Sequence, residues 1–154
     1  MRLTDILTPA RIKVPLTAGT KRGLIDELVD VLDANGDLAD RDRVLQAVLA
    51  REENRTTGIG GGLAIPHGKC GEVKRLVVAL GRCAQDVDFN SIDGKPVRLL
   101  ILLVSPMDQT GPHIQALARI SRLMGVKSLR NRLCAAASPE EMFQIIQKHE
   151  LEEG

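Results

Sequence analysis

The segment from Leu99 to Val104 is the longest apolar run in this 154-residue chain. Its length of six residues is far below the roughly 20 that a helix needs to cross a bilayer, but it suits a buried strand. A strand without polar side chains must be covered on both faces, which is typical of the centre of a sheet flanked by helices. Together with Val97 and Arg98, the run therefore predicts a central strand over residues 97–104.

Further strands and helices are expected on either side of this segment. Short apolar runs bounded by turn residues predict strands at residues 12–16, 63–65 and 76–80. The first of these contains Pro15, which indicates a sheet edge. Apolar side chains at helical spacing predict helices that follow the capping residues Thr20, Asp40 and Ser138 or begin near Pro112. The glycine-rich stretch 56–62 is expected to be an irregular loop.

The order of these elements indicates an α/β fold, because strands and helices interleave along the chain. The turn residues Asp93 and Gly94 predict a hairpin, so the sheet is expected to be mixed rather than wholly parallel. No repeat, low-complexity tract or charge block divides the sequence. We predict one domain over residues 1–154, a three-layer sandwich in which helices cover both faces of a mixed sheet.

Composition excludes several classes of function. The formal net charge is +1, from 21 basic and 20 acidic residues, so binding to nucleic acid is not indicated. Two phenylalanines are the only aromatic residues of the Phe, Tyr and Trp types, which argues against stacking platforms for bases and aromatic clefts for sugars. Cys70, Cys83 and Cys134 have no CxxC spacing and are expected to be reduced thiols. Without a signal peptide or a membrane-spanning segment, we expect a cytoplasmic protein.

His67 has the sequence context best suited to chemistry. It lies between Pro66 and Gly68, at the end of an expected strand and after the glycine-rich stretch. Proline restricts the backbone before the histidine, and glycine leaves space after it for another molecule. An imidazole with a pKa near neutrality could act there as a nucleophile or a proton carrier. A surface histidine in a turn would explain the same context equally well.

His113 and Arg51 are further candidates for a phosphate site. His113 falls in the first turn of an expected helix, where free amides and the helix dipole attract anions and lower the pKa of an imidazole. It could orient a bound phosphate, or it could be a helix-start residue without a task. The guanidinium of Arg51 suits phosphate oxygens, although a solvent-facing salt bridge is the default role of an arginine. The hydroxyls of Thr56 and Thr57 could donate to a phosphate or cap the loop.

The glycine-rich stretch matches no nucleotide or metal motif. Gly58 and Gly60 begin a pattern in which Leu63 replaces the third glycine of the dinucleotide fingerprint, and a strand follows instead of a helix. The Gly-Lys-Ser/Thr of a Walker loop is missing as well. His67 and Cys70 could begin a metal site, but the sequence offers no second closely spaced ligand pair. We expect neither a metal nor a cofactor.

Three parts of the sequence are far more specific together than singly: Arg51, the segment Thr-Gly-Ile-Gly-Gly-Gly-Leu-Ala-Ile-Pro-His-Gly-Lys at 57–69, and Pro112-His113. In this combination the chain resembles the mannitol/fructose-type IIA domains of the bacterial phosphoenolpyruvate-dependent phosphotransferase system, most closely the nitrogen-related branch. The resemblance covers nearly the whole chain, and the spacing of the two histidines also fits. Gly61 departs from that branch, which often has a larger polar residue at this position.

The resemblance implies a mixed five-stranded sheet between helices and a histidine that carries a phosphoryl group. His67 would receive this group from the phosphohistidine of a small HPr-like carrier, without a nucleotide or a metal. His113 would be the second active-site histidine and support the phosphate, and Arg51 would lie beside the site. The loop residues expected around the phosphoryl group are Thr57, Gly58, Gly60 and Gly68.

Three functions are compatible with these residues. A regulatory phosphocarrier would change the proteins it binds, because phosphorylation adds about −1.5 to −2 charges to a chain of net charge +1. A sugar-transport IIA component would pass its phosphoryl group to a IIB domain and on to fructose or mannitol. A pure binding module would never carry phosphate. We expect the regulatory role, because the chain contains neither a IIB domain nor a membrane permease.

Overall fold

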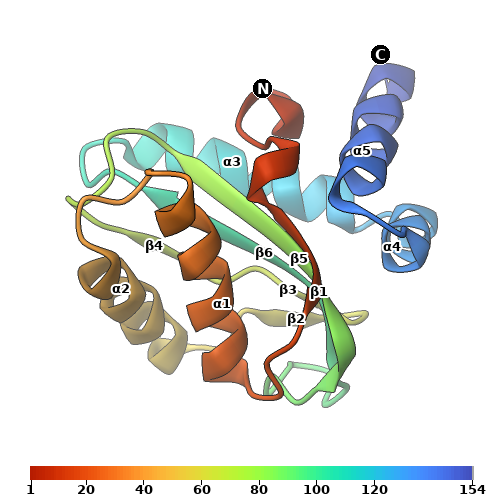
Figure 1. Ribbon diagram of the computed structural model, residues 1–154, viewed down its shortest axis with the longest axis horizontal. Coiled ribbons are helices and arrows are strands. Elements are labelled where there is room, and N and C mark those ends of the chain that lie inside the picture. The colour runs from red at the N-terminus through yellow and green to blue at the C-terminus, as the bar shows by residue number, and fades with distance from the viewer. Residues whose placement is uncertain (154) are drawn as a thin grey trace.

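The computed structural model describes residues 1–153, which form a six-stranded sheet between two layers of helices (Figure 1). The strands are β1 (Ile12–Leu16), β2 (Gly58–Gly60), β3 (Leu63–Ala64), β4 (His67–Lys69), β5 (Val77–Val87) and β6 (Val97–Ser105). The α-helices are α1 (Lys21–Ala34), α2 (Arg41–Asn54), α3 (Thr110–Met124), α4 (Lys127–Ala135) and α5 (Pro139–Glu153). Two short 3-10 helices, η1 (Leu3–Asp5) and η2 (Pro9–Arg11), precede β1.

The apolar run at 97–104 occupies the centre of the sheet, as expected. Strand β6 pairs with β5 on one side and with β3 and β4 on the other, in the order β1-β5-β6-β3-β2. Strands β5 and β6 are antiparallel, whereas β1 runs parallel to β5 at the edge of the sheet. The strand expected at 76–80 is longer than its apolar part and continues to Val87, which pairs with Val97. The predicted mixed sheet is confirmed.

Strands β3 and β4 are two parts of one position in the sheet. Ala64 pairs with Leu100 and His67 pairs with Leu103, so both parts keep the same parallel register against β6. Between them lies Pro66, which has no N–H to donate and interrupts the ladder. The six strands therefore fill the five positions that the family resemblance implied. His67 is the first residue of the strand after the interruption.

Alternate side chains of β6 enter two separate cores. One core, formed with α1 and α2, contains Leu100, Leu102 and Val104. The other, formed with α3, α4 and α5, contains Leu99, Ile101 and Leu103. Figure 1 shows α1 in front of the sheet and α3 behind it. Because both faces of β6 are buried over residues 99–104, its side chains there are apolar without alternation, and the predicted three-layer sandwich is confirmed.

The helix starts predicted from capping residues are confirmed. Thr20 Oγ1 accepts a hydrogen bond from the backbone N–H of Gly23 at 3.1 Å. Asp40 Oδ1 accepts one from the backbone N–H of Arg43 at 3.2 Å, and Ser138 caps α5 in the same way. Each side chain satisfies an amide that has no partner within the helix. These local bonds explain why the helix starts can be read from single residues.

The expectation of an irregular loop at 56–62 is wrong. Strand β2 pairs antiparallel with β3, and the two form a hairpin that turns at Gly61 and Gly62, between the paired residues Gly60 and Leu63. The φ angles of Gly60, Gly61 and Gly62 are 102°, 67° and 79°, a region that glycine adopts without the steric cost of a side chain. The hairpin turn precedes β3, whereas His67 follows it, so the turn lies at the far end of this strand position.

Gly61, which departs from the pattern of the nitrogen-related branch, accommodates a side chain from α4. A Cβ atom at Gly61 would lie 2.9 Å from the guanidinium of Arg130. The backbone N–H of Gly61 donates to Asp93 Oδ2 at 3.1 Å. The close approach of Arg130 and the positive φ angle together explain glycine at this position.

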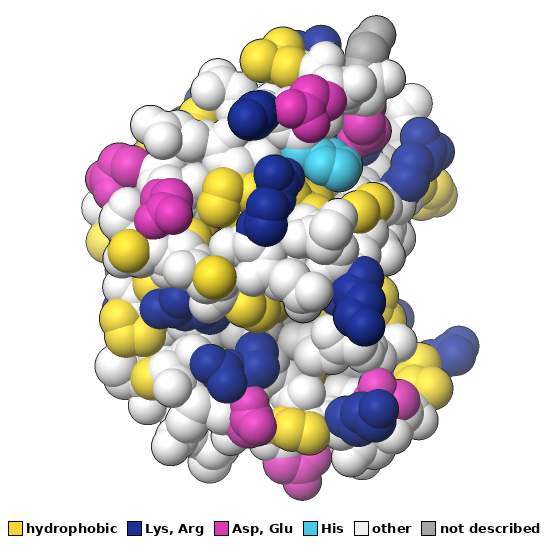
Figure 2. All heavy atoms as spheres, turned by 90° about the vertical axis from the view of Figure 1, so that its right-hand side faces the viewer, with side chains coloured by type: hydrophobic (Ala, Val, Ile, Leu, Met, Phe, Trp, Pro, Cys, Tyr) yellow, Lys and Arg dark blue, Asp and Glu magenta, His cyan; other side chains and the backbone are white. Residues whose placement is uncertain are grey.

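The end of the molecule that carries α4 and α5 shows no single-sign surface. Figure 2 views this side, where Lys and Arg side chains are spread widely and Asp and Glu side chains lie among them. Such mixing agrees with the nearly balanced charge of the chain. None of the helices in residues 1–153 is both long and apolar enough to span a membrane.

Candidate active site

His67 uses one ring nitrogen to hold its imidazole in place. Nδ1 lies 2.8 Å from the carbonyl oxygen of Ile65. Because a carbonyl oxygen only accepts hydrogen bonds, Nδ1 carries the proton and Nε2 keeps its lone pair. The ring is half-buried at the start of β4, directly after the buried residues Ile65 and Pro66. This tautomer leaves the Nε2 lone pair available to act as a nucleophile.

His113 lies beside His67, although the two are far apart in the sequence. The ring centroids are 5.7 Å apart and the ring planes are inclined by 57°. His113 occupies the first turn of α3, and its Nδ1 lies 2.6 Å from the hydroxyl of Ser105, the last residue of β6. The parallel pairing of β4 with β6 brings His67 close to the end of β6, where α3 begins. The structure therefore brings the two predicted histidines together.

The side chains of Arg51 and Lys69 line the same cavity as the two histidines. This cavity of about 510 Å³ lies between α2, β4 and the start of α3. Arg51 and His67 also line a second cavity of about 250 Å³, together with Arg55. Arg51 is held at the end of α2 by a hydrogen bond of 3.1 Å from Nη1 to the Arg55 carbonyl. Among the described residues that line these two cavities none is acidic, so the site favours anions.

The pKa values of His67 and His113 are both lowered from the ordinary value of 6.5. Burial is the largest cause for both, because it disfavours a charged ring. The charge of Arg51 lowers the pKa of His67 further, against the opposing effect of the hydrogen bond to Ile65. At His113, the neighbouring His67 and the charge of Lys69 add to the lowering of the pKa. Both imidazoles are therefore neutral at neutral pH.

We expect both imidazoles to remain neutral into the acidic range. In a titration followed by proton–nitrogen NMR, the midpoints of His67 and His113 should fall below 6.5. The stability conferred by the neutral rings should be fully present above this unfolded-state pKa and be lost as the pH falls through the lower folded-state pKa. Arg51→Gln should raise the midpoint of His67, because it removes a nearby positive charge. A wild-type midpoint for His67 at or above the ordinary value would contradict this account.

The three glycines expected around a phosphoryl group lie in different surroundings. Gly68 lines the larger cavity, and its lack of a side chain lets α2 approach, since a Cβ atom would lie 3.4 Å from the backbone of Val48. Gly58 packs against Ser91, whose Cα would lie 3.0 Å from an added Cβ atom. Gly60 is the last residue of β2, directly before the hairpin turn. Gly68 is thus the only one of the three that lines either of the two cavities at His67.

Thr57 directs its hydroxyl into the protein. Its Oγ1 donates to Glu52 Oε1 at 2.5 Å, and its backbone N–H donates to Glu52 Oε2 at 2.7 Å. The hydroxyl of Thr56 likewise donates to the Phe89 carbonyl at 3.0 Å. Both hydroxyl protons are used within the protein, although Thr56 and Thr57 both line the smaller cavity at His67.

Sequence reasoning assigned no role to Lys69 and Ser105. Lys69 offered a usable signal, because residues two apart on a strand point to the same side and Lys69 follows His67 by two. Its Nζ donates to Thr110 Oγ1 at 3.3 Å, which keeps the ammonium group near the start of α3. Ser105 offered no comparable signal, since its contact with His113 depends on how α3 folds back at the end of β6.

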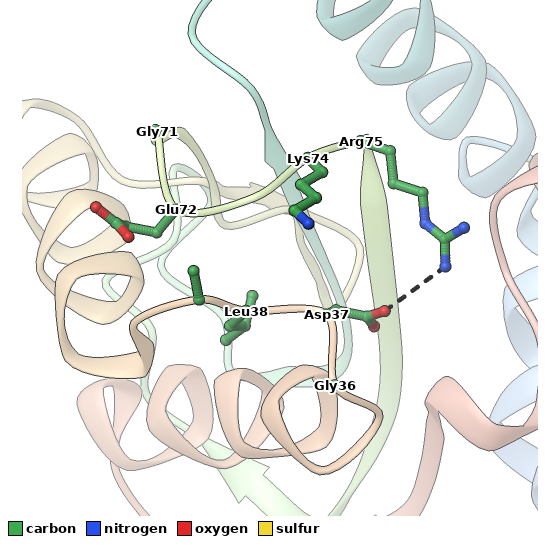
Figure 3. A pocket seen from close by; sticks show the side chains of 8 residues that line it. Gly36, Asp37, Leu38, Gly71, Glu72, Lys74 and Arg75 are labelled. Carbon is green, nitrogen blue, oxygen red and sulfur yellow. Dashed lines mark ion pairs between the residues drawn. The ribbon is translucent and has the colours of Figure 1, made fainter.

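A cavity of about 440 Å³ lies away from the histidines, between the α1–α2 connection and the segment that leads into β5 (Figure 3). Its lining includes Asp37 and Glu72 as well as Lys74 and Arg75, so the charges are balanced. Arg75 approaches Asp37 at 3.8 Å, and Asp37 also pairs with Arg11 at 2.7 Å. Within residues 1–153, no group of three or more His, Cys, Asp or Glu residues is placed to hold a metal. The only cavities described here that a histidine lines are the two at His67.

The sequence was compared with a family model and with curated relatives. Residues 5–149 match the family model described as "Phosphoenolpyruvate-dependent sugar phosphotransferase system, EIIA 2". The fructose-specific EIIA component of Haloferax volcanii is 36% identical over 149 residues, which cover 95% of this chain and 97% of that protein. The fructose-specific EIIABC component of Bacillus subtilis is 37% identical over 150 residues, but these cover 97% of this chain and only 24% of that longer protein.

A solved structure also matches over most of its length. The nitrogen regulatory protein IIA-Ntr of Neisseria meningitidis superimposes with a TM-score of 0.85 at 34% sequence identity. The match covers 92% of this chain and 97% of that one. The chain is thus similar both to a nitrogen regulatory protein and to fructose-specific components.

Proposed function

Because the chain belongs to the EIIA 2 family of the phosphoenolpyruvate-dependent sugar phosphotransferase system, we propose that it is a phosphocarrier in which His67 stores a phosphoryl group. The donor is the phosphohistidine of an HPr-like protein. The observation that carries this proposal is the hydrogen bond of 2.8 Å from Nδ1–H of His67 to the Ile65 carbonyl. It leaves the Nε2 lone pair as the nucleophile of a ring that lines a cavity with Arg51 and Lys69.

The transfer needs one bond to form and one to break. The Nε2 lone pair of His67 forms a bond to phosphorus, while the P–N bond of the donor breaks and its electron pair returns to the donor ring. His67 keeps the proton on Nδ1, so its phosphorylated ring carries a positive charge that the Ile65 carbonyl stabilises. Protein catalysis of phosphoryl transfer consists almost entirely of positioning and charge stabilisation. A neutral, fixed imidazole beside two cations meets both needs.

The phosphoryl oxygens would be bound by groups from three elements. Arg51 at the end of α2 and Lys69 in β4 supply positive charge, and the start of α3 supplies backbone amides without helical partners. Nδ1 of His113 and the Ser105 hydroxyl are hydrogen-bonded at 2.6 Å. We propose that the hydroxyl is the donor, which would leave Nε2–H of that ring as a neutral donor. His113 thereby supports the phosphoryl group without adding a second cationic ring.

Exposed apolar side chains around the site provide a surface on which the donor protein docks. Met107 and Ile114 are 61% and 60% exposed and line the larger cavity. Ile59 and Ile92 are 46% and 62% exposed and line the smaller one. Apolar patches rimmed by polar residues are typical of protein-binding sites. A regulatory target or a IIB domain would use the same surface, because it too must reach the phosphoryl group.

We expect the double variant Met107→Ala and Ile114→Ala to weaken docking of the donor. Truncating two exposed anchors at an interface should raise the KM for the HPr-like donor about tenfold, equivalent to about 1.4 kcal/mol, with kcat nearly unchanged. Initial rates at varied donor concentration give both constants. Leu151→Ala is the control, because Leu151 is 59% exposed on α5 but lines neither cavity at His67. An unchanged KM in the double variant would place docking elsewhere.

The phosphocarrier proposal is tested by labelling. The chain is incubated with labelled phosphoenolpyruvate, enzyme I and an HPr-like protein, and acid-labile phosphate on the chain is then measured. Stoichiometric, acid-labile label supports the proposal. If the donor is phosphorylated in the same tube and the chain is not, the pure binding module is the better interpretation.

We further propose that the role is regulatory. The likeness to the Neisseria nitrogen regulatory protein over nearly its whole length supports this role. Sugar transport is the second candidate, favoured by the identities of 36% and 37% to fructose-specific components. Adding a fructose-type IIB domain to the phosphorylated chain separates the two. Rapid loss of label to the IIB domain would favour transport, whereas retained label would favour regulation.

A further inference from the structure

Glu52 is a buried carboxylate next to Arg51 in the last turn of α2. Its side chain is 4% exposed and lines neither of the two cavities at His67. Oε1 accepts the Thr57 hydroxyl at 2.5 Å, and Oε2 accepts the Thr57 backbone N–H at 2.7 Å. The Lys21 ammonium lies 2.8 Å from Oε2 and completes the set of partners. Because a buried charge is costly unless it is paired and hydrogen-bonded, these contacts hold the carboxylate in one place.

Thr57 connects Glu52 to the ring of His67 through two further hydrogen bonds. The Thr57 carbonyl accepts the backbone N–H of Ile65 at 3.0 Å. The Ile65 carbonyl in turn accepts Nδ1–H of His67 at 2.8 Å. The Glu52 carboxylate is therefore connected to Nδ1 of His67 through Thr57 and Ile65, with one hydrogen bond at each step.

We propose that Glu52 is a positioning residue for phosphoryl transfer, which fixes the orientation and the Nδ1–H tautomer of His67 through Thr57 and Ile65. The consequence for transfer rests on the function proposed above, but the effect on the tautomer does not. Lys21 compensates the carboxylate, and its Nζ also lies 4.8 Å from the centre of the Phe89 ring. The negative charge is thus paired inside the protein, although it still acts to raise the pKa of His67.

Glu52→Gln tests this role, because it keeps the shape of the side chain but replaces one acceptor oxygen by an amide donor. We expect phosphorylation of His67 to slow about 10- to 100-fold, the usual effect of disturbing a group that orients a reacting side chain. In proton–nitrogen NMR of the unphosphorylated variant, the single Nδ1–H tautomer of His67 should become a mixture. Glu53→Gln is the matched control, since it makes the same change at the exposed neighbour and should alter neither the rate nor the tautomer.

The two measurements separate this inference from the proposed function. If the wild-type chain accepts no phosphate but Glu52→Gln still loses the single tautomer, the phosphocarrier proposal fails and the orienting role of Glu52 stands. If Glu52→Gln keeps the wild-type tautomer, Glu52 does not orient the ring; if the wild type accepts phosphate and Glu52→Gln loses the tautomer without any change in rate, Glu52 is not a positioning residue for transfer. Should Glu52→Gln unfold, Thr57→Val removes only the hydroxyl contact and should shift both readouts in the same direction by a smaller amount. Wild-type behaviour of a folded Thr57→Val variant would then refute the inference.

Discussion

His67→Ala is expected to reduce phosphate incorporation to background. The variant removes Nε2, the atom to which the phosphoryl group would be bound. His113 is the nearest imidazole, with its ring centroid 5.7 Å away, but its Nδ1 is engaged by Ser105 at 2.6 Å and its Nε2 is the proposed proton donor. The measurement is acid-labile label after incubation with phosphoenolpyruvate, enzyme I and an HPr-like protein.

The control for this result is the third histidine. His149→Ala alters an imidazole on α5 that lies 3.7 Å from Glu153 and lines neither cavity at His67. We expect it to incorporate phosphate like the wild type. Full incorporation by a folded His67→Ala protein would overturn the assignment of the phosphorylated residue.

Glu150→Ala is expected to cause the largest loss of stability among single charge removals. Glu150 is 2% exposed and joins three parts of the chain. It accepts the backbone N–H groups of Leu3 at 2.7 Å and Thr4 at 3.1 Å, and it pairs with Arg119 at 2.7 Å. Its removal leaves the buried N–H of Leu3 and the half-buried donors of Thr4 and Arg119 without this acceptor, which should cost about 3 kcal/mol of unfolding free energy and lower Tm by roughly 9 °C.

Urea denaturation of Glu150→Ala and Glu152→Ala provides the test. Glu152 is exposed on the same helix, so its removal should change the unfolding free energy by no more than about 0.5 kcal/mol. Equal stability of the two variants would show that the buried contacts of Glu150 contribute little. Because Arg119 also pairs with Glu153 at 2.9 Å, we expect Glu150→Ala to remain folded at room temperature.

Most of the fold could be predicted because its signals are local. The uninterrupted apolar side chains of residues 99–104 indicated a strand buried on both faces, and the alternation between two cores explains why. Thr20 and Asp40 marked helix starts through hydrogen bonds to amides three residues away. The hairpin at Gly60–Gly62 was missed because a glycine-rich segment has the same composition whether it forms a loop or a tight turn.

The site could be predicted only in part. The Pro66-His67-Gly68 context made His67 a candidate, and the family resemblance pointed to His67 and His113 as the two active-site histidines. The structure places their ring centroids 5.7 Å apart. The roles of Ser105 and Glu52 were not predicted, because a buried serine or glutamate carries no local pattern that reveals its partner. Thr57 was expected at the phosphate, yet its hydroxyl donates to Glu52.

Short-range chemistry in the chain was enough to indicate the strands β1, β3, β5 and β6 and the helix starts, since apolar periodicity and capping act within a few residues. The proline–glycine frame marked the imidazole of His67 as a candidate, and the family resemblance singled it out. The tertiary structure decided that Nε2 of this imidazole is free and that Arg51 and Lys69 lie beside it. It also decided that the buried Glu52 carboxylate binds Thr57, whose carbonyl accepts the N–H of Ile65. These properties depend on hydrogen bonds and electrostatic fields between segments that are distant along the chain. Their strength is set by burial and by separations of a few ångströms, and both arise only once the sheet and its helices have packed.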